Sequence, residues 1–197
     1  MRKQIGVLAS GTGTVLQAVI DGCADGRLAA DVCVVVSNNS GSGAAQRAER
    51  HAIPFRHLSG QTHVEPAALD AAILGALVDH GTDLVFLAGY MKKLGPRTLA
   101  HFRGRIINTH PALLPKFGGL GMYGARVHAA VLASGDRVTG VSVHRVEGEY
   151  DTGPVLAQCE VPVLPGDDVE ALSARVQTRE RLFVVETLAR IARGELG

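Results

Sequence analysis

The chain of 197 residues contains no tryptophan, and aromatic residues make up only 4% of it. Proteins that bind single-stranded nucleic acid rely on aromatic side chains as platforms for base stacking. The formal net charge is +1, so the sequence also offers no excess of basic residues to neutralise a phosphate backbone. We therefore expect no nucleic-acid partner.

Cysteine is scarce, and no apolar run is long. Cys23, Cys33 and Cys159 are an odd number without C-x-x-C spacing, which predicts free thiols in a reducing compartment and neither a disulfide set nor a zinc site. No apolar run reaches the roughly 20 residues of a membrane span. The chain enters its first expected strand without the pattern of a signal peptide. These absences predict a cytoplasmic protein with no membrane partner.

Short apolar runs alternate with segments of helical periodicity along most of the chain. The expected strands are Lys3 to Ala9, Asp31 to Val36, Pro54 to His57, Asp83 to Ala88 and Arg105 to Asn108. This alternation predicts an α/β fold with a doubly wound, mostly parallel sheet. Two further runs, Val138 to Val146 and Val155 to Val163, predict an antiparallel edge hairpin, and a long C-terminal helix should start at Asp167 or Asp168.

A glycine turn, Ser10 to Thr14, stands between the first strand and the first helix. Free backbone N–H groups and the helix dipole make such a turn an anion site. A dinucleotide fingerprint would need glycine where Leu16 stands and an acid after the second strand, where the chain has Ser37 to Asn39. The turn favours a single phosphate over a dinucleotide, although a plain strand-to-helix turn stays open.

The segment Asn108 to Pro115 reads NTHPALLP and follows the last buried parallel strand. Side chains alternate along an extended segment, so Asn108 and His110 should point the same way and Thr109 the other. An amide and an imidazole on one side could bind a developing oxyanion. Asp151, in a loop bounded by glycine and proline, is the expected partner, and a nearby acid should raise the pKa of His110. A purely structural histidine stays open.

These motifs resemble the two signatures of the folate-dependent formyltransferase family. NTHPALLP is similar to N-x-H-P-S-L-L-P, and the segment Asp151 to Gln158 is similar to D-x-G-P-x-x-x-Q. The resemblance covers the whole chain and implies a Rossmann-like formyltransferase fold. It implies formyl transfer from the co-substrate 10-formyltetrahydrofolate to the amine of glycinamide ribonucleotide, a step of purine biosynthesis, with no metal.

The resemblance also implies roles for individual residues. The matching catalytic residues are Asn108, His110 and Asp151. The positions matching ribonucleotide contacts are Gly13, Thr14, Val15, Gln177 and Glu180. Folate should lie between two loops composed of Met91, Lys92, Lys93, Leu94, Val146, Glu147, Gly148, Glu149 and Tyr150. The chain would then be one domain, with a phosphate-binding half at 1–108 and a folate and catalytic half at 109–197. A homodimer stays open.

The chain departs from the family pattern at three places. Val15 stands where many members have asparagine, and an arginine that supports the folate tail in some members is replaced near Glu65. The segment Gly118 to Gly124, part of a glycine-rich flap that begins at Lys116, is longer than the common form. We expect this flap to be mobile beside the site.

The sequence says less about the roles of the other histidines. His144 matches a family histidine, and a supporting role is as plausible as simple packing. A zinc site from His110, His144 and Asp151 is disfavoured because no ligand pair has helical or knuckle spacing. We expect the others to be surface or capping groups: His51, His57, His63, His80, His101 and His128.

Three other functions compete with ribonucleotide formylation. A 10-formyltetrahydrofolate hydrolase shares the core but adds an N-terminal regulatory domain, and a methionyl-tRNA formyltransferase adds a basic C-terminal domain. We expect neither addition in this near-neutral chain, which starts at its first strand and stops after one helix. The third alternative is a non-catalytic sugar-phosphate binding module, in which His110 and Asp151 would be structural.

Overall fold

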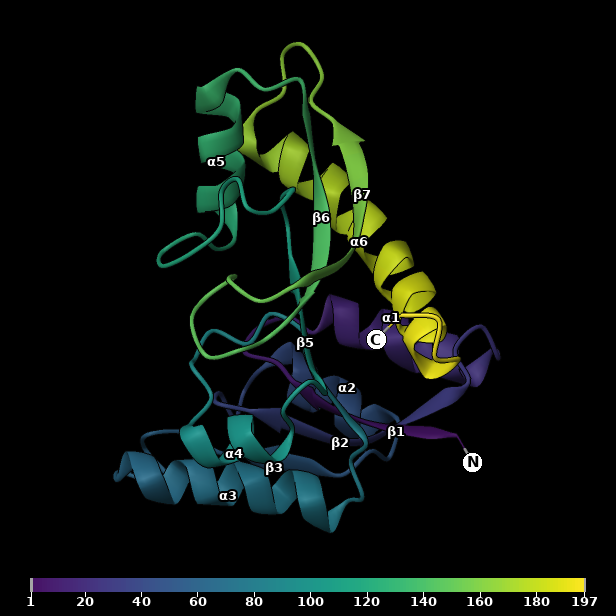
Figure 1. The fold of residues 1–197 in the computed structure, drawn as a ribbon, viewed down its shortest axis with the longest axis vertical. Coiled ribbons are helices and arrows are strands. Elements are labelled where there is room, and N and C mark those ends of the chain that lie inside the picture. The colour runs from purple at the N-terminus through teal and green to yellow at the C-terminus, as the bar shows by residue number, and fades with distance from the viewer. Residues whose placement is uncertain (1, 197) are drawn as a thin grey trace.

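The computed structural model describes residues 2–196, which form one mixed sheet with helices on both faces (Figure 1). The strands are β1 (Lys3–Leu8), β2 (Ala30–Ser37), β3 (Phe55–His57), β4 (Leu84–Leu87), β5 (Ile106–His110), β6 (Val138–Arg145) and β7 (Val155–Pro162). The helices are α1 (Thr14–Ala24), α2 (Gly43–Arg50), α3 (Pro66–Asp79), α4 (Pro96–His101), α5 (Ala125–Ser134) and α6 (Val169–Ala192).

The strand order is β3-β2-β1-β4-β5-β6-β7. The pairs from β3 to β5 are parallel, and β6 pairs antiparallel with both β5 and β7. The expected doubly wound sheet, edge hairpin and long C-terminal helix are therefore confirmed. Because the order reverses between β1 and β4, the loops after these strands open a crevice where ligands bind in sheets of this kind.

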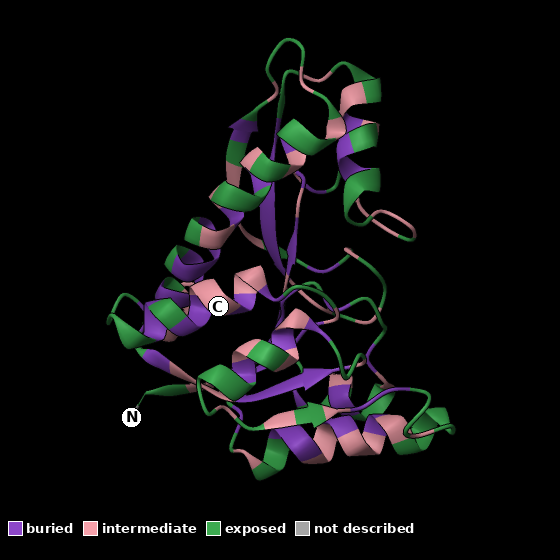
Figure 2. Ribbon diagram, turned by 180° about the vertical axis from the view of Figure 1, so that it is seen from behind, coloured by how far each residue is buried: buried purple, intermediate pink, exposed green. Residues whose placement is uncertain are grey.

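Two hydrophobic cores cover the two faces of the sheet. One packs residues of α1, α2, α5 and α6 against the strands, and the other packs α3 and α4. Figure 2 shows the central strands buried along most of their length, whereas the helices are buried only on stripes. Burial on both faces explains why these strands are runs of continuously apolar residues. Along β5, Ile106 faces the second core and Ile107 the first.

Helix ends follow from local hydrogen bonding. The Asp168 carboxylate caps α6 by accepting from the Ala171 N–H at 2.8 Å, so the later of the two candidate residues is the cap. Helix α4 has no cap of its own. Asp70 of α3 accepts from the N–H groups of Arg97 and Thr98, which fixes α4 beside the sheet.

One expectation about the surface is wrong. His128 is only 2% exposed, although we expected it to be a surface or capping group. It lies on the inner side of α5 with Val127 and Val131, where α5 packs against α6. None of the helices within residues 2–196 combines the length and apolar character needed to cross a membrane.

Candidate active site

Ser10 connects three loops at the carboxyl edge of the sheet. Its N–H donates to the Gly89 carbonyl at 3.2 Å, and its hydroxyl accepts from the Met91 N–H at 2.8 Å. The same hydroxyl donates to Asn38 Oδ1. The loops that follow β1, β2 and β4 are therefore tied together at the crevice that the strand order creates.

The glycine turn leaves the first N–H groups of α1 without a side-chain cap. Gly13 has φ of +70°, a left-handed conformation that costs glycine little, and it precedes Thr14 directly. The turn is braced from α2, where Arg47 Nε donates to the Thr12 carbonyl at 3.0 Å. Val15 packs partly buried against the first core. Uncapped N–H groups at a helix start suit an anion.

The register between β5 and β6 assembles the polar cluster. Asn108 lies directly opposite His144 in the antiparallel ladder, and the Asn108 Nδ2 to His144 Nε2 distance is 3.0 Å. Asp151 lies against both, with its Oδ1 3.5 Å from Asn108 Nδ2 and 3.3 Å from His144 Nε2. His110 Nδ1 is 3.4 Å from Asp151 Oδ2. As expected, Asn108 and His110 point to the same side.

Asp151 is held in a conformation that few side chains adopt. Its φ is +56°, in the left-handed region that aspartate and asparagine tolerate better than most residues. Burial alone would raise the pKa of this carboxyl. Hydrogen bonds from His144 and from the Gly119 N–H, at 2.9 Å, together with the nearby imidazoles outweigh burial and hold its pKa below the usual range. Asp151 is therefore ionised at neutral pH.

The expected rise in the pKa of His110 is wrong. Its side chain is almost fully buried, and this burial lowers the pKa more strongly than the Asp151 charge raises it. Loss of hydration disfavours the imidazolium. His110 Nε2 lies 2.7 Å from the Phe117 carbonyl, which can only accept, so Nε2 carries a hydrogen. The Phe117 carbonyl of the flap thus accepts the hydrogen bond that His110 Nε2 donates.

The second signature glutamine supports the loop that follows β5. Gln158 Nε2 donates to the Leu114 carbonyl at 2.9 Å and to Ser142 Oγ at 2.8 Å. The Ser142 hydroxyl donates to the Ala112 carbonyl and accepts from the Leu114 N–H. The hydroxyl of this fully buried serine thus donates one hydrogen bond and accepts two. The segments 108–115 and 151–158 are therefore joined twice, by the hydrogen bond from Gln158 to Leu114 and by the contacts of Asp151 with Asn108 and His110.

A pocket adjoins the polar cluster on the α4 side of the sheet. Of the expected folate residues, those lining it are Lys92, Lys93, Leu94, Val146, Gly148, Glu149 and Tyr150. Asn108, His144 and Asp151 form its inner wall. Lys93 Nζ bridges the two loops by an ion pair with Glu149 at 2.8 Å.

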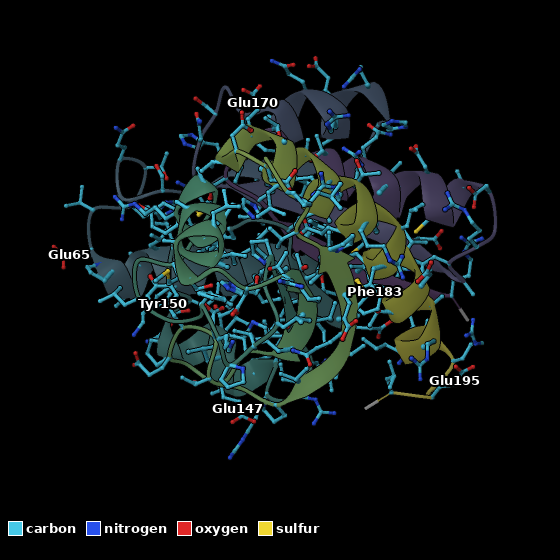
Figure 3. The ribbon with its side chains drawn as sticks, turned by 90° about the horizontal axis from the view of Figure 1, so that it is seen from above. Glu65, Glu147, Tyr150, Glu170, Phe183 and Glu195 are labelled. Carbon is cyan, nitrogen blue, oxygen red and sulfur yellow. The ribbon has the colours of Figure 1, made fainter. Side chains whose placement is uncertain are left out.

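Two expected folate residues do not line this pocket. Met91 is 49% exposed, and Glu147 is exposed on the loop between β6 and β7. Figure 3 shows Glu147 and Tyr150 on this loop, with Glu147 pointing outward. Glu65, which stands where some members have arginine, lies at the start of α3 at the edge of the same view.

The expected ribonucleotide residues on α6 differ in burial. Gln177 is exposed, and its Nε2 donates to Ser173 Oγ on its own helix. Glu180, less than one turn further on, is 9% exposed and accepts a hydrogen bond from Thr109 Oγ1 at 3.0 Å. Thr109 therefore faces α6, opposite to Asn108 and His110.

The described chain, residues 2–196, places no group of three or more His, Cys, Asp or Glu side chains so that they could hold a metal ion. The three cysteines are free thiols. Burial raises the pKa of Cys23 to about 11, so this thiol is protonated at neutral pH.

Reasoning from the sequence missed several residues of the site. Leu87 and Leu99 line the pocket, and Phe117 and Gly119 contact the catalytic candidates through backbone atoms. Pocket-lining apolar side chains look like ordinary core residues in a sequence. Backbone contacts carry no residue-type signal, so no pattern could have revealed them.

The fold and the site define an α/β enzyme suited to attack of a nucleophile on a carbonyl carbon. An amide, an imidazole and an ionised carboxylate converge at the carboxyl edge of the sheet, where the uncapped start of α1 also lies. Comparison with known proteins narrows this class. The sequence profile of the formyl transferase family matches residues 3–188, and the chain belongs to this family.

Named relatives share most of this chain. A phosphoribosylglycinamide formyltransferase of Mycobacterium tuberculosis (strain H37Rv) is 43% identical over 186 residues, which cover 94% of this chain and 83% of the relative. The chloroplastic enzyme of that name from Arabidopsis thaliana is 41% identical over 194 residues, covering 96% of this chain and 65% of the relative. The chain thus spans slightly less than two thirds of this plant protein.

A solved structure agrees with the fold throughout. Glycinamide ribonucleotide transformylase 1 from Symbiobacterium toebii superposes with a TM-score of 0.91 at 40% identity, covering 98% of this chain and 88% of that structure. The expected membership of the formyltransferase family and the Rossmann-like fold are confirmed.

Proposed function

We propose that the chain transfers the formyl group of 10-formyltetrahydrofolate to the amine of glycinamide ribonucleotide in purine biosynthesis. The observation that carries this proposal is the cluster of Asn108, His110 and Asp151. Asn108 and Asp151 line the pocket, and His110 adjoins it through Asp151. A formyl donor in the pocket would place its carbonyl at these side chains. An amine acceptor anchored by a phosphate at the turn would reach the same edge of the sheet.

In the proposed reaction the amine attacks the formyl carbon. The new C–N bond forms as the carbonyl becomes an oxyanion, and Asn108 Nδ2 and His110 Nε2 donate hydrogen bonds to this oxygen. Because burial lowers the pKa of His110, it acts as a neutral hydrogen-bond donor. The bond between the formyl carbon and N10 of the folate then breaks. The proton lost by the amine reaches N10 through water held by Asp151.

The flap must move for this chemistry. His110 Nε2 now donates to the Phe117 carbonyl at 2.7 Å, and the formyl oxygen would replace that carbonyl. The flap also holds Asp151 through the Gly119 N–H. We therefore propose that the flap opens to admit the donor and that it otherwise shields the catalytic cluster from water.

The binding roles follow the same division. We propose that Gly13, Thr14 and Val15 bind the phosphate through backbone N–H groups, in a phosphate-binding half at residues 1–108. The half at 109–197 supplies His110 and Asp151, and Asn108 is the last residue of the first half. The folate pocket between the halves is lined from both. His144 supports Asn108 and Asp151. The free thiols fit a cytoplasmic enzyme, and a homodimer remains a prediction.

A spectrophotometric assay of tetrahydrofolate release tests this function. Release from a 10-formylfolate donor should require glycinamide ribonucleotide. Release without the ribonucleotide would indicate a hydrolase. No release in either case, with the ribonucleotide still bound, would indicate a binding module, and both results would overturn the proposal.

A further inference from the structure

Glu180 is an acid on the inner side of α6, which packs against α1 and β6. Its side chain faces the sheet, where an unpaired carboxylate would be costly. Burial raises the pKa of Glu180, and the hydrogen bond from Thr109 and the charge of Arg181 oppose this rise. A hydrophobic side chain would fill this position at lower cost, so the carboxylate requires an explanation.

The two carboxylate oxygens differ in their surroundings. Oε1 accepts the Thr109 hydroxyl hydrogen at 3.0 Å, and Oε2 has no partner within residues 2–196. Within residues 2–196, the buried side-chain nitrogen and oxygen atoms without a hydrogen-bond partner are His128 Nδ1, Thr139 Oγ1 and Arg145 Nε. Oε2 is not one of them and must therefore still reach solvent. Thr109 therefore fixes Oε1 of Glu180, whereas Oε2 is available to accept a hydrogen bond.

Thr109 connects this carboxylate to the catalytic strand. It stands between Asn108 and His110 on β5, and the alternation of the strand turns its hydroxyl toward α6. Asn108 and His110 lie on the other side, where Asn108 lines the folate pocket and His110 contacts Asp151. The two sides of one short strand end thus bear different polar groups, directly at the edge where the substrates must meet.

We propose that Thr109 is a positioning residue for the ribonucleotide acceptor. Its hydroxyl fixes Oε1 of Glu180, so that Oε2 accepts a hydrogen bond from a hydroxyl group of the ribose. This inference rests on the proposed function. A hydroxyl suits Oε2 better than the reacting amine, because the amine must reach the formyl carbon on the Asn108 side. Thr109 acts only through Glu180 and takes no part in bond making.

Matched variants of the full-length chain test this role. Thr109→Val removes the hydroxyl with little change of shape, and Thr109→Ser keeps it. The Kd of glycinamide ribonucleotide is measured by calorimetry without folate, and kcat and both KM values are measured in the release assay. Thr109→Val should raise the Kd and KM of the ribonucleotide about tenfold, with kcat and the folate KM changed less than about twofold. Thr109→Ser should restore ribonucleotide binding to within about threefold.

A double-variant cycle isolates the route through Glu180. In a Glu180→Gln background, Thr109→Val should add less than about a twofold further loss of ribonucleotide affinity. The inference is overturned if Thr109→Val binds as tightly as the parent chain, if Thr109→Ser loses as much as Thr109→Val, or if the losses simply add. A parent chain that neither binds the ribonucleotide nor formylates it would instead overturn the proposed function.

Discussion

The two walls of the pocket are built differently. The His144 and Asp151 side chains of the inner wall are 2% and 9% exposed, and they are linked to Asn108 and to the adjoining His110. The outer wall, with Lys93, Glu149 and Tyr150, is exposed and is bridged by one ion pair whose side chains are 45% and 75% exposed. Groups fixed in a dry environment act strongly and specifically, whereas exposed pairs are weak and screened by salt. Substitutions should separate the two walls.

The largest effect should come from the inner wall. Asp151→Asn removes the charge, while asparagine tolerates the φ of +56° at this position. We expect kcat to fall about 10³-fold with little change in ribonucleotide affinity, because the carboxylate that relays the proton is lost. Steady-state assays and calorimetry measure the two quantities. A variant that retains more than a tenth of the parent kcat would show that the carboxylate is structural.

The loop beneath the inner wall should come next. Ser142→Ala leaves the Leu114 N–H and the Ala112 carbonyl without the hydroxyl that each now contacts. We expect the free energy of unfolding to fall by about 2 kcal/mol, since buried polar groups lose their partner. Urea denaturation measures this change. Thr152→Ala, on the exposed loop between β6 and β7, is the control and should change stability far less.

Burial near the inner wall should also make stability depend on pH. His110 and His128 have pKa values below the ordinary 6.5 because burial disfavours their charged forms. The unfolded chain therefore binds more protons below about pH 6.5, and the free energy of unfolding should fall as the pH drops through this range. His128→Leu removes one of the two groups and should reduce this slope. Equal slopes in urea titrations of the variant and the parent would contradict this cause.

The pH dependence of activity should follow the ionisation of Asp151 rather than that of the buried histidines. Because the pKa of Asp151 is held below its usual range, its carboxylate stays ionised well below neutrality and takes up a proton only at acid pH. We expect kcat to fall on the acid side as this proton is taken up. A profile of kcat that stays flat through the carboxylate range, in a chain still folded by circular dichroism, would rule out this role.

The smallest effect should come from the outer wall. Lys93→Met removes the ion pair to Glu149 but keeps a long side chain against Tyr150. We expect the folate KM to rise less than about threefold, and the difference from the parent to vanish in high salt. Lys92→Met is the matched control, because Lys92 lines the same pocket and has no ion pair within residues 2–196. A large, salt-independent rise would contradict the contrast between the walls.

The sequence alone determined the parts that depend on local pattern. Buried strands in a parallel sheet must be apolar on both faces, so the runs of β1, β2 and β4 were visible directly. The order of these runs predicted the doubly wound sheet. Asn108 and His110 lie two residues apart on one strand, so their shared direction followed from the extended backbone. The two signatures pointed to the formyltransferase family, which the comparisons confirmed.

Tertiary structure decided how these groups interact. The β5–β6 register placed His144 beside Asn108, and no local rule sets a register across 36 residues. Packing decided the direction of the pKa shift of His110, since the cost of burial depends on neighbours that a sequence does not reveal. It also buried His128 and joined Thr109 to Glu180, 71 positions apart. The sequence specifies the chemistry of each side chain, but the burial of side chains and their contacts with distant residues arise only when the segments pack together.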